Sequence, residues 1–243
     1  MSEEIPLSRD GRATELAHRR MRSAILQGNL APGQLLSQVD LARHLDVSRT
    51  PLRDAVRTLQ EEGLVQARGR RLQVAGFSIA DLEDLYSLRL LVETVAVGVT
   101  VPQLRPEELA ELRGLLAQMN HHGDRRDFDR TEIPHRRFHG LLVAGAGART
   151  TKLVQRLFDH AERYRRAYST LDESVFTISA DDHRQLFEAA SAGDAARAAR
   201  ISTGHSFRTA ERLIAELDPS HRPGHLKLAR EMALAQAEEL PRF

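Results

Sequence analysis

The sequence predicts a mainly α-helical protein, with a small N-terminal unit of three helices and a β-hairpin followed by an all-α helical bundle. Two observations lead to this fold class. From residue 79 onward, apolar residues recur at helical spacing and strand-like alternation is absent. Before that point, two short strand-like runs, 64–68 and 72–75, flank the turn Gly69-Arg70-Arg71, as they would in a β-hairpin.

Breaks in the helical pattern divide the chain into segments. Residues 1–11 are predicted to form a flexible arm, 12–76 an N-terminal domain, 77–217 the helical bundle, and 218–243 a tail with a possible short helix. Proline, glycine and the loop predicted around His121-His122 separate the helices of the bundle. We expect helices at residues 12–28, 79–99, 106–120, 127–145, 149–168, 178–192, 194–217 and 225–239.

The composition excludes several classes of protein. The 243 residues include no cysteine, which excludes disulfides, thiolate metal ligands and a cysteine nucleophile. The N-terminus lacks the basic and apolar regions of a signal peptide, and no apolar run approaches the ~20 residues that span a bilayer. We therefore expect a soluble, cytoplasmic protein with no membrane partner. The net charge is +1, but residues 1–76 hold 12 Arg against 9 Asp or Glu, so the basic excess lies in the N-terminal domain.

Residues 30–63 are predicted to form two short helices joined by a tight turn. Ser37 with Asp40 resembles a capping box for the first of these helices. Ser48 is a suitable N-cap for the second, and Gly63 suits the position just after its C-terminal end. Together with the hairpin that follows, this is the pattern of a winged helix-turn-helix.

The second of these helices has two distinct faces. Counted from Arg49 at 100° per residue, Arg53 falls near 40° and Arg57 near 80°. The sector from about 240° to 340° is aliphatic, with Leu52, Ala55, Val56 and Leu59. One face can pack while its neighbour presents guanidinium groups, as a recognition helix in a DNA major groove requires. The basic hairpin tip, with Arg70, can reach phosphates or the minor groove. The combination favours DNA binding over a solvated helix with ordinary surface arginines.

The first helix of the bundle carries a charged pair on its apolar stripe. Arg89 and Glu93 lie four residues apart on that stripe, where a charge needs a partner. Two interpretations are open. The pair is either purely structural, or Arg89 points into a cavity and holds a carboxylate ligand bidentately.

Four of the eleven histidines form a pattern of their own. His135 and His139 are spaced i, i+4 on one predicted helix, a spacing that lets two imidazoles bind one metal. His183 lies on the penultimate helix of the bundle and His205 on its last helix. Imidazoles that converge from three helices can form a site in a bundle core. The alternative is a set of ordinary surface or hydrogen-bonded histidines.

The segment from Thr14 to Phe77 resembles the winged helix-turn-helix domain of GntR-type bacterial transcription regulators. The matching words are LAPG at 30–33, LA at 41–42, VSRTPLRDA at 47–55 and EGLV at 62–65. The resemblance implies operator contacts by Arg49, Thr50 and Arg53, with Gly69 at the tip of the wing.

Residues 79–217 resemble the all-helical FCD effector domain of the FadR-like subfamily. The matching words are Asp84-Leu85-Tyr86 through Arg89 and Glu93, Phe138-His139, Asp182-His183-Arg184, and His205. Many members bind a divalent metal through an Asp and three His, and the resemblance carries three of these ligands to His139, His183 and His205. The Asp position is His135 here, so we expect an all-imidazole site that suits Zn²⁺ or Ni²⁺. The alternative is a metal-free polar pocket whose histidines bind the effector directly.

These features predict a homodimeric, ligand-responsive transcription regulator. Two winged domains would bind the half-sites of double-stranded operator DNA. The family implies a small organic acid as effector, whose carboxylate would complete the metal coordination and pair with Arg89. One alternative is a helical metal-dependent hydrolase, which the absence of an H-E-x-x-H pattern disfavours. Another is a constitutive DNA-binding protein whose helical domain only dimerises.

Overall fold

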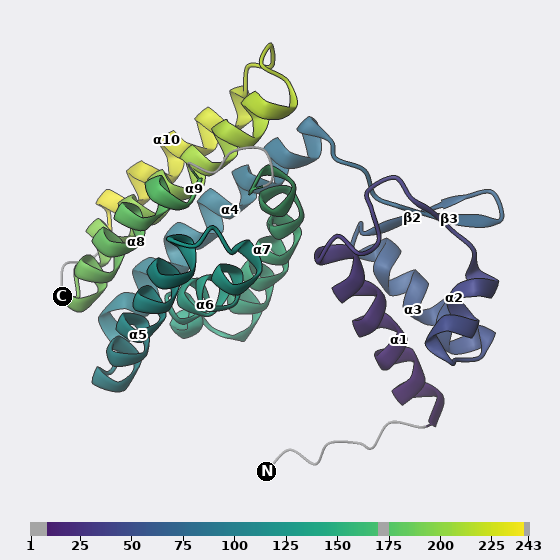
Figure 1. Ribbon diagram of the computed structural model, residues 1–243. Coiled ribbons are helices and arrows are strands. Elements are labelled where there is room, and N and C mark those ends of the chain that lie inside the picture. The colour runs from purple at the N-terminus through teal and green to yellow at the C-terminus, as the bar shows by residue number, and fades with distance from the viewer. Residues whose placement is uncertain (1–8, 170–174, 241–243) are drawn as a thin grey trace. The chain divides into compact units, whose positions relative to one another are not determined.

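The computed structural model describes residues 9–169 and 175–240 (Figure 1). The chain divides into two compact units, Met1–Phe77 and Ser78–Phe243. Most of the predicted arm, residues 1–8, lies outside the described residues. Residues 9–11, which were expected to belong to that arm, are the first turn of helix α1.

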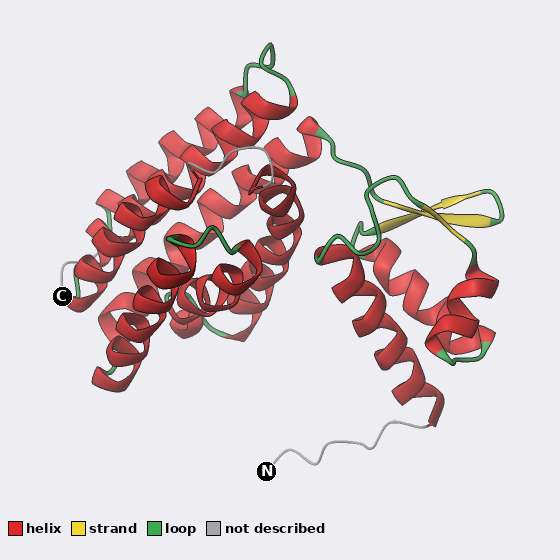
Figure 2. Cartoon of the chain, in the orientation of Figure 1, coloured by secondary structure: helices red, strands yellow, loops and turns green. Residues whose placement is uncertain are grey.

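The first unit consists of three helices and a small antiparallel sheet (Figure 2). Its elements are α1 (Arg9–Leu26), β1 (Leu35–Leu36), α2 (Gln38–Leu45), α3 (Arg49–Glu61), β2 (Val65–Arg68) and β3 (Arg71–Val74). The predicted hairpin is confirmed, and β1 pairs with its outer edge to give the strand order β1-β3-β2. The sequence did not predict β1, because two residues are too few to show a period. The core of the unit contains Met21, Leu52, Leu59, Leu64 and Leu72.

Local chemistry sets the ends of the two central helices. The Ser37 hydroxyl accepts a hydrogen bond from the Asp40 backbone N–H at 3.3 Å, as the sequence predicted. Gly63 has a φ of 72°, a left-handed conformation that favours glycine just after a helix. Ser48 is the N-cap residue of α3, but its hydroxyl makes no capping bond. The reason is that Pro51 occupies the third helical position, where the usual donor N–H is missing.

The second unit is a helical bundle around a central helix. Its elements are α4 (Ile79–Thr100), the 3₁₀ turn η1 (Val101–Gln103), α5 (Pro106–Gly123), α6 (Phe128–Leu141), η2 (Ala144–Ala146), α7 (Ala148–Ser169), α8 (Val175–Ser191), α9 (Ala195–Leu217) and α10 (Gly224–Glu238). Helix α4 packs against α7, α9 and α10, while α5 packs against α6 and α8. This arrangement confirms the predicted all-α bundle.

Helix boundaries in the bundle differ from the prediction by up to four residues, and two of them illustrate why. His121 and His122 lie in the last turn of α5 and not in a loop, because Gly123 ends this helix and does not interrupt it. Helix α6 ends at Leu141, four residues early. The next segment runs close to α4: the Thr100 hydroxyl accepts a hydrogen bond from the Gly145 N–H at 3.1 Å. A Cβ at Gly145 would lie 3.2 Å from the Thr100 Cα, so glycine permits this approach.

The stretch Ile79–Gln103 is long and apolar enough to cross a membrane. The expectation that no apolar run approaches such a length was therefore wrong. In this unit, 61% of the stretch's most apolar window is buried inside the protein. A helix covered by partners on several sides is apolar around most of its circumference, and α4 is such a central helix.

The C-terminal tail belongs to the bundle of its own chain. Helix α10 packs along α4 and α9. Pro223, at its N-cap position, supplies no side-chain hydrogen bond, and the buried Glu83 of α4 takes that role. Its carboxylate accepts hydrogen bonds from the backbone N–H groups of His225 at 2.8 Å and Leu226 at 3.2 Å. It also pairs with Nε2 of His221 at 2.7 Å.

Replacement of Glu83 by alanine should detach this end of α10. Two buried backbone N–H groups lose their acceptor, so the free energy of unfolding should fall by roughly 2–3 kcal/mol. Chemical unfolding followed by circular dichroism measures the change. Asp84→Ala is the matched control, since Asp84 is exposed and should have little effect. Equal stability of the Glu83 and Asp84 variants would contradict the capping role.

Candidate functional site

One face of α3 is exposed and basic. Arg49, Thr50, Arg53 and Arg57 are all exposed, while the opposite side of the helix is buried in the core of the unit. Arg57 lies 3.9 Å from Glu61, an exposed and weak pairing. The three arginines at i, i+4 and i+8 thus share a surface that solvent can reach, as the sequence predicted.

The tip of the wing adds further positive charge. Gly69 and Arg70 form the exposed turn between β2 and β3, and Gly69 has a φ of 59°. Arg68 and Arg71 are exposed too and face each other across the hairpin as the last paired residues before the turn. Arg68 was not singled out in the sequence, although its pairing position follows from the hairpin register. Such a basic surface suits a polyanion.

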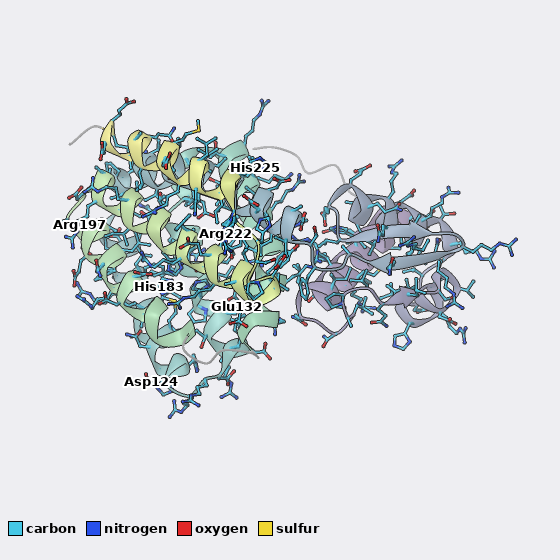
Figure 3. All side chains as sticks on the ribbon, turned by 90° about the horizontal axis from the view of Figure 1, so that it is seen from above. Asp124, Glu132, His183, Arg197, Arg222 and His225 are labelled. Atoms are coloured by element: carbon cyan, nitrogen blue, oxygen red, sulfur yellow. The ribbon has the colours of Figure 1, made fainter. Side chains whose placement is uncertain are left out.

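The four candidate histidines converge in the second unit. His135 and His139 come from α6, His183 from α8 and His205 from α9, and none is more than 8% exposed (Figure 3 labels His183). One nitrogen from each ring can be chosen so that all four lie within 4.8 Å of one another. Nε2 of His139 and Nε2 of His183 are 3.1 Å apart.

This geometry is compatible with a divalent cation held among the four rings. Zn–N bonds of 2.0–2.1 Å in a tetrahedron place ligand nitrogens about 3.3 Å apart, close to the separation of His139 and His183. The distance also fits a hydrogen bond between the two rings. Hydrogen bonds from His205 and Arg208, against the opposing effect of burial, lower the pKa of Asp182 to about 2. This ionised carboxylate accepts from Nδ1 of His205 at 3.2 Å, which leaves the lone pair of that ring on Nε2.

His135 differs from the other three histidines in the charged side chains that contact its ring. Its Nδ1 lies 2.9 Å from Nη1 of Arg165 and 3.4 Å from a carboxylate oxygen of Glu132. A guanidinium can only donate, so the closer contact makes Nδ1 an acceptor and places the ring proton on Nε2. As a ligand through Nε2, His135 would need its proton on Nδ1, shared with Glu132.

Burial favours the neutral form of His135 and His139, the form in which an imidazole can bind a metal. Burial lowers the pKa of His135 to about 4, assisted by Arg165 and opposed by Glu132. Burial and the neighbouring histidines lower the pKa of His139 well below its ordinary value.

A cavity of about 390 Å³ adjoins the cluster. Glu93, His139, Phe158 and Ser202 line it on the side of the histidines. Arg136, Arg137, Gln155 and Asp159, from α6 and α7, supply further polar lining. Much of the remaining wall is aliphatic, with Val97, Leu141, Leu142, Val143 and Val154. The site therefore offers a mostly apolar pocket with polar groups beside the histidines.

Arg89 is held by its neighbour on α4. Its Nε donates to Glu93 at 2.7 Å and its Nη2 donates to the second oxygen at 3.4 Å. The guanidinium carbon lies 4.7 Å from the ring centre of Tyr86 and 5.0 Å from the ring centre of Phe158. Glu93 lines the cavity, whereas Arg89 is not among the lining residues. The structural interpretation of the pair accounts for all these contacts, and Arg89 lies behind Glu93.

Sequence reasoning missed several polar groups around the cluster. Glu132, Arg165 and Asp182 contact the histidines. Glu132 and Asp182 lie near His135 and His183 in the sequence, which hinted at this role, whereas no sequence signal pointed to Arg165. The Tyr86 hydroxyl and Arg165 Nε are buried without a hydrogen-bond partner among the described residues. Burial raises the pKa of Tyr86, so it remains a hydrogen-bond donor.

Comparisons with known proteins agree with both units. A family model described as bacterial regulatory proteins, gntR family, matches residues 13–71, and the FCD domain model matches residues 84–207. The HTH-type transcriptional repressor GlaR of Escherichia coli is 27% identical, over 77% of this chain and 90% of the relative. An uncharacterised HTH-type transcriptional regulator of Streptomyces ambofaciens is 31% identical, over 72% of this chain and 74% of the relative.

A solved structure shares the fold. Escherichia coli McbR/YncC superposes with a TM-score of 0.76 at 19% identity, over 88% of this chain and 100% of that one. At this identity the likeness concerns the fold alone.

Metal content provides a direct test of the histidine cluster. Tag-free protein purified without chelators should hold about one Zn²⁺ or Ni²⁺ per chain by elemental mass spectrometry. His183→Ala should abolish this binding. His135→Asn should keep most of it, since three imidazoles suffice for a cation with an open position.

His121→Ala, an exposed histidine on α5, is the matched control and should leave the metal content unchanged. Absence of metal from the wild-type protein, with no gain in melting temperature on addition of Zn²⁺ or Ni²⁺, would contradict the metal site.

Proposed function

We propose that a small organic acid entering the helical unit controls operator binding by this chain. The chain belongs to the gntR family of bacterial regulatory proteins and carries an FCD domain. It is a DNA-binding transcription regulator, not an enzyme. The observation that carries this proposal is the buried histidine cluster, whose member His139 lines a cavity of the same unit. A cation held by His139, His183 and His205, with His135 as a fourth ligand, would supply a positive centre for a carboxylate.

A metal-independent regulator is the second candidate. It is favoured by the separation of 3.1 Å between His139 and His183, which a ring-to-ring hydrogen bond also explains. In that case the histidines, of which His139 lines the cavity, would bind the acid directly. The metal measurement described above separates the two candidates.

DNA binding is assigned to α3 and the wing. Arg49, Thr50, Arg53 and Arg57 would enter the major groove, while Gly69 and Arg70 would approach the backbone or minor groove. The small basic excess of this unit suggests that two copies are needed for useful affinity. An exposed apolar stripe on α4, with Leu88, Val95 and Val99, supports a homodimer in which a second copy covers it. Such a regulator acts in the cytoplasm.

Arg53→Ala should weaken operator binding. Loss of one bidentate or phosphate contact per protomer is expected to lower the affinity by about 10–100-fold. Fluorescence anisotropy with a labelled operator fragment at fixed salt measures this change. Arg20→Ala, an exposed arginine on α1, is the matched control. Unchanged binding by the Arg53 variant would count against α3 as the recognition helix.

Helix α7 connects the effector cavity with the start of the bundle. Phe158 and Asp159 line the cavity, and Arg165 contacts His135. On the same helix, the buried Tyr164 donates from its hydroxyl to Asp81 at 2.6 Å and accepts from the Ser78 backbone N–H at 3.3 Å. Ser78 is the N-cap of α4 and the first residue after the DNA-binding unit. A shift of α7 on effector binding would therefore be transmitted to the linker through Tyr164.

Tyr164→Phe should uncouple the two units. The ring still fills its site, so metal content and effector affinity should persist. The effector should then change operator affinity by several-fold less than in the wild type, because the bond to Asp81 is lost. Operator titrations with and without effector measure this difference.

Asp81→Ala should have the same effect, and the double variant should lose no more than either single one, as for a pair acting through one contact. A full effector response in Tyr164→Phe would contradict this route.

A further inference from the structure

The carboxylates around the histidine cluster are already neutralised. Those that contact the histidines or line the cavity beside them each face an arginine. Glu132 pairs with Arg165 at 2.6 Å, and Glu93 with Arg89 at 2.7 Å. The remaining two pairs are Asp182 with Arg208 and Asp159 with Arg136. None of these acidic side chains is left to balance an additional positive charge.

A divalent cation at this site would therefore keep its full charge. A ligating imidazole is neutral, so the four histidines offset none of it. The rings are at most 8% exposed, and an uncompensated charge in such surroundings is strongly unfavourable. The adjoining cavity reaches His139 and is the place from which an anion can approach.

We infer that the effector is a dianionic acid whose two carboxylates lie close enough together to reach one cation. A monocarboxylate would leave one positive charge buried, whereas a dianion leaves none. The inference rests on the proposed function, since it requires an acid in the cavity and a cation at the histidines.

The rest of the cavity defines the remainder of this effector. Its volume of about 390 Å³ exceeds the needs of two adjacent carboxylates. The wall beyond His139 is aliphatic, with Val97, Leu142, Val143 and Val154. A hydrocarbon substituent would bury its surface there, so a substituted malonate or succinate fits the site better than the bare diacid.

A matched pair of acids tests the charge requirement. Butylmalonate and hexanoate carry the same hydrocarbon chain and differ by one carboxylate. Isothermal titration of the Zn²⁺-loaded full-length chain should show butylmalonate binding at least about tenfold more tightly, a difference of ~1.4 kcal/mol. The preference should disappear after the metal is removed with a chelator.

Equal or tighter binding of hexanoate would overturn the inference while leaving the proposed function intact. Binding of neither acid to the metal-loaded chain would overturn both.

A pair of variants at His135 provides the matched control. His135→Asp places one negative charge at the cluster, and His135→Asn changes the side chain in the same way without the charge. The preference for butylmalonate should fall several-fold in the Asp variant and persist in the Asn variant. An unchanged preference in a folded, metal-loaded Asp variant would overturn the inference. If either variant fails to fold, the wild-type comparison alone decides.

Discussion

The burial of four imidazoles between α6, α8 and α9 is the constraint on which the second unit depends. Polar groups in such a place are tolerated only when each finds a partner. The surrounding ion pairs supply partners: Arg165, paired with Glu132, donates to His135, and Asp182 accepts from His205. The Tyr86 hydroxyl is different, because it is buried without a partner among the described residues. Tyr86 does not line the adjoining cavity, whereas His139 and Glu93 do, so these two are the polar side chains through which the cavity meets the buried cluster.

The same constraint explains why α4 is apolar on so many sides yet carries charge. Its Glu93 faces the cavity and is neutralised along the helix by Arg89, so the pair can be buried together. Near its N-terminus, Glu83 caps α10. One helix thus joins the tail, the effector cavity and, through Ser78, the linker to the DNA-binding unit.

Much of this could be predicted from local patterns, and the remainder could not. The faces of α3 follow from a period within one helix. Spacing pairs only His135 with His139, and it was the resemblance to FCD domains that implied the meeting of His139, His183 and His205. Arg165 could not be predicted, since it stands in an arginine-rich stretch without a distinguishing period and its role depends on α7 crossing α6. The N-cap at Ser48 was placed correctly, but Pro51 removes the donor that would make its bond.

Regulation by this bundle requires that effector binding favour one arrangement of the linker over another. A ligand shifts such an equilibrium only by its difference in affinity for the two states. The cavity is suited to produce this difference because two of its walls are separate helices, α6 and α7, and only α7 reaches the start of α4 through Tyr164. An acid bound between these walls fixes their separation, whereas an acid bound to one wall alone would not. Under the proposed function, an effector would therefore need to be large enough to touch both walls.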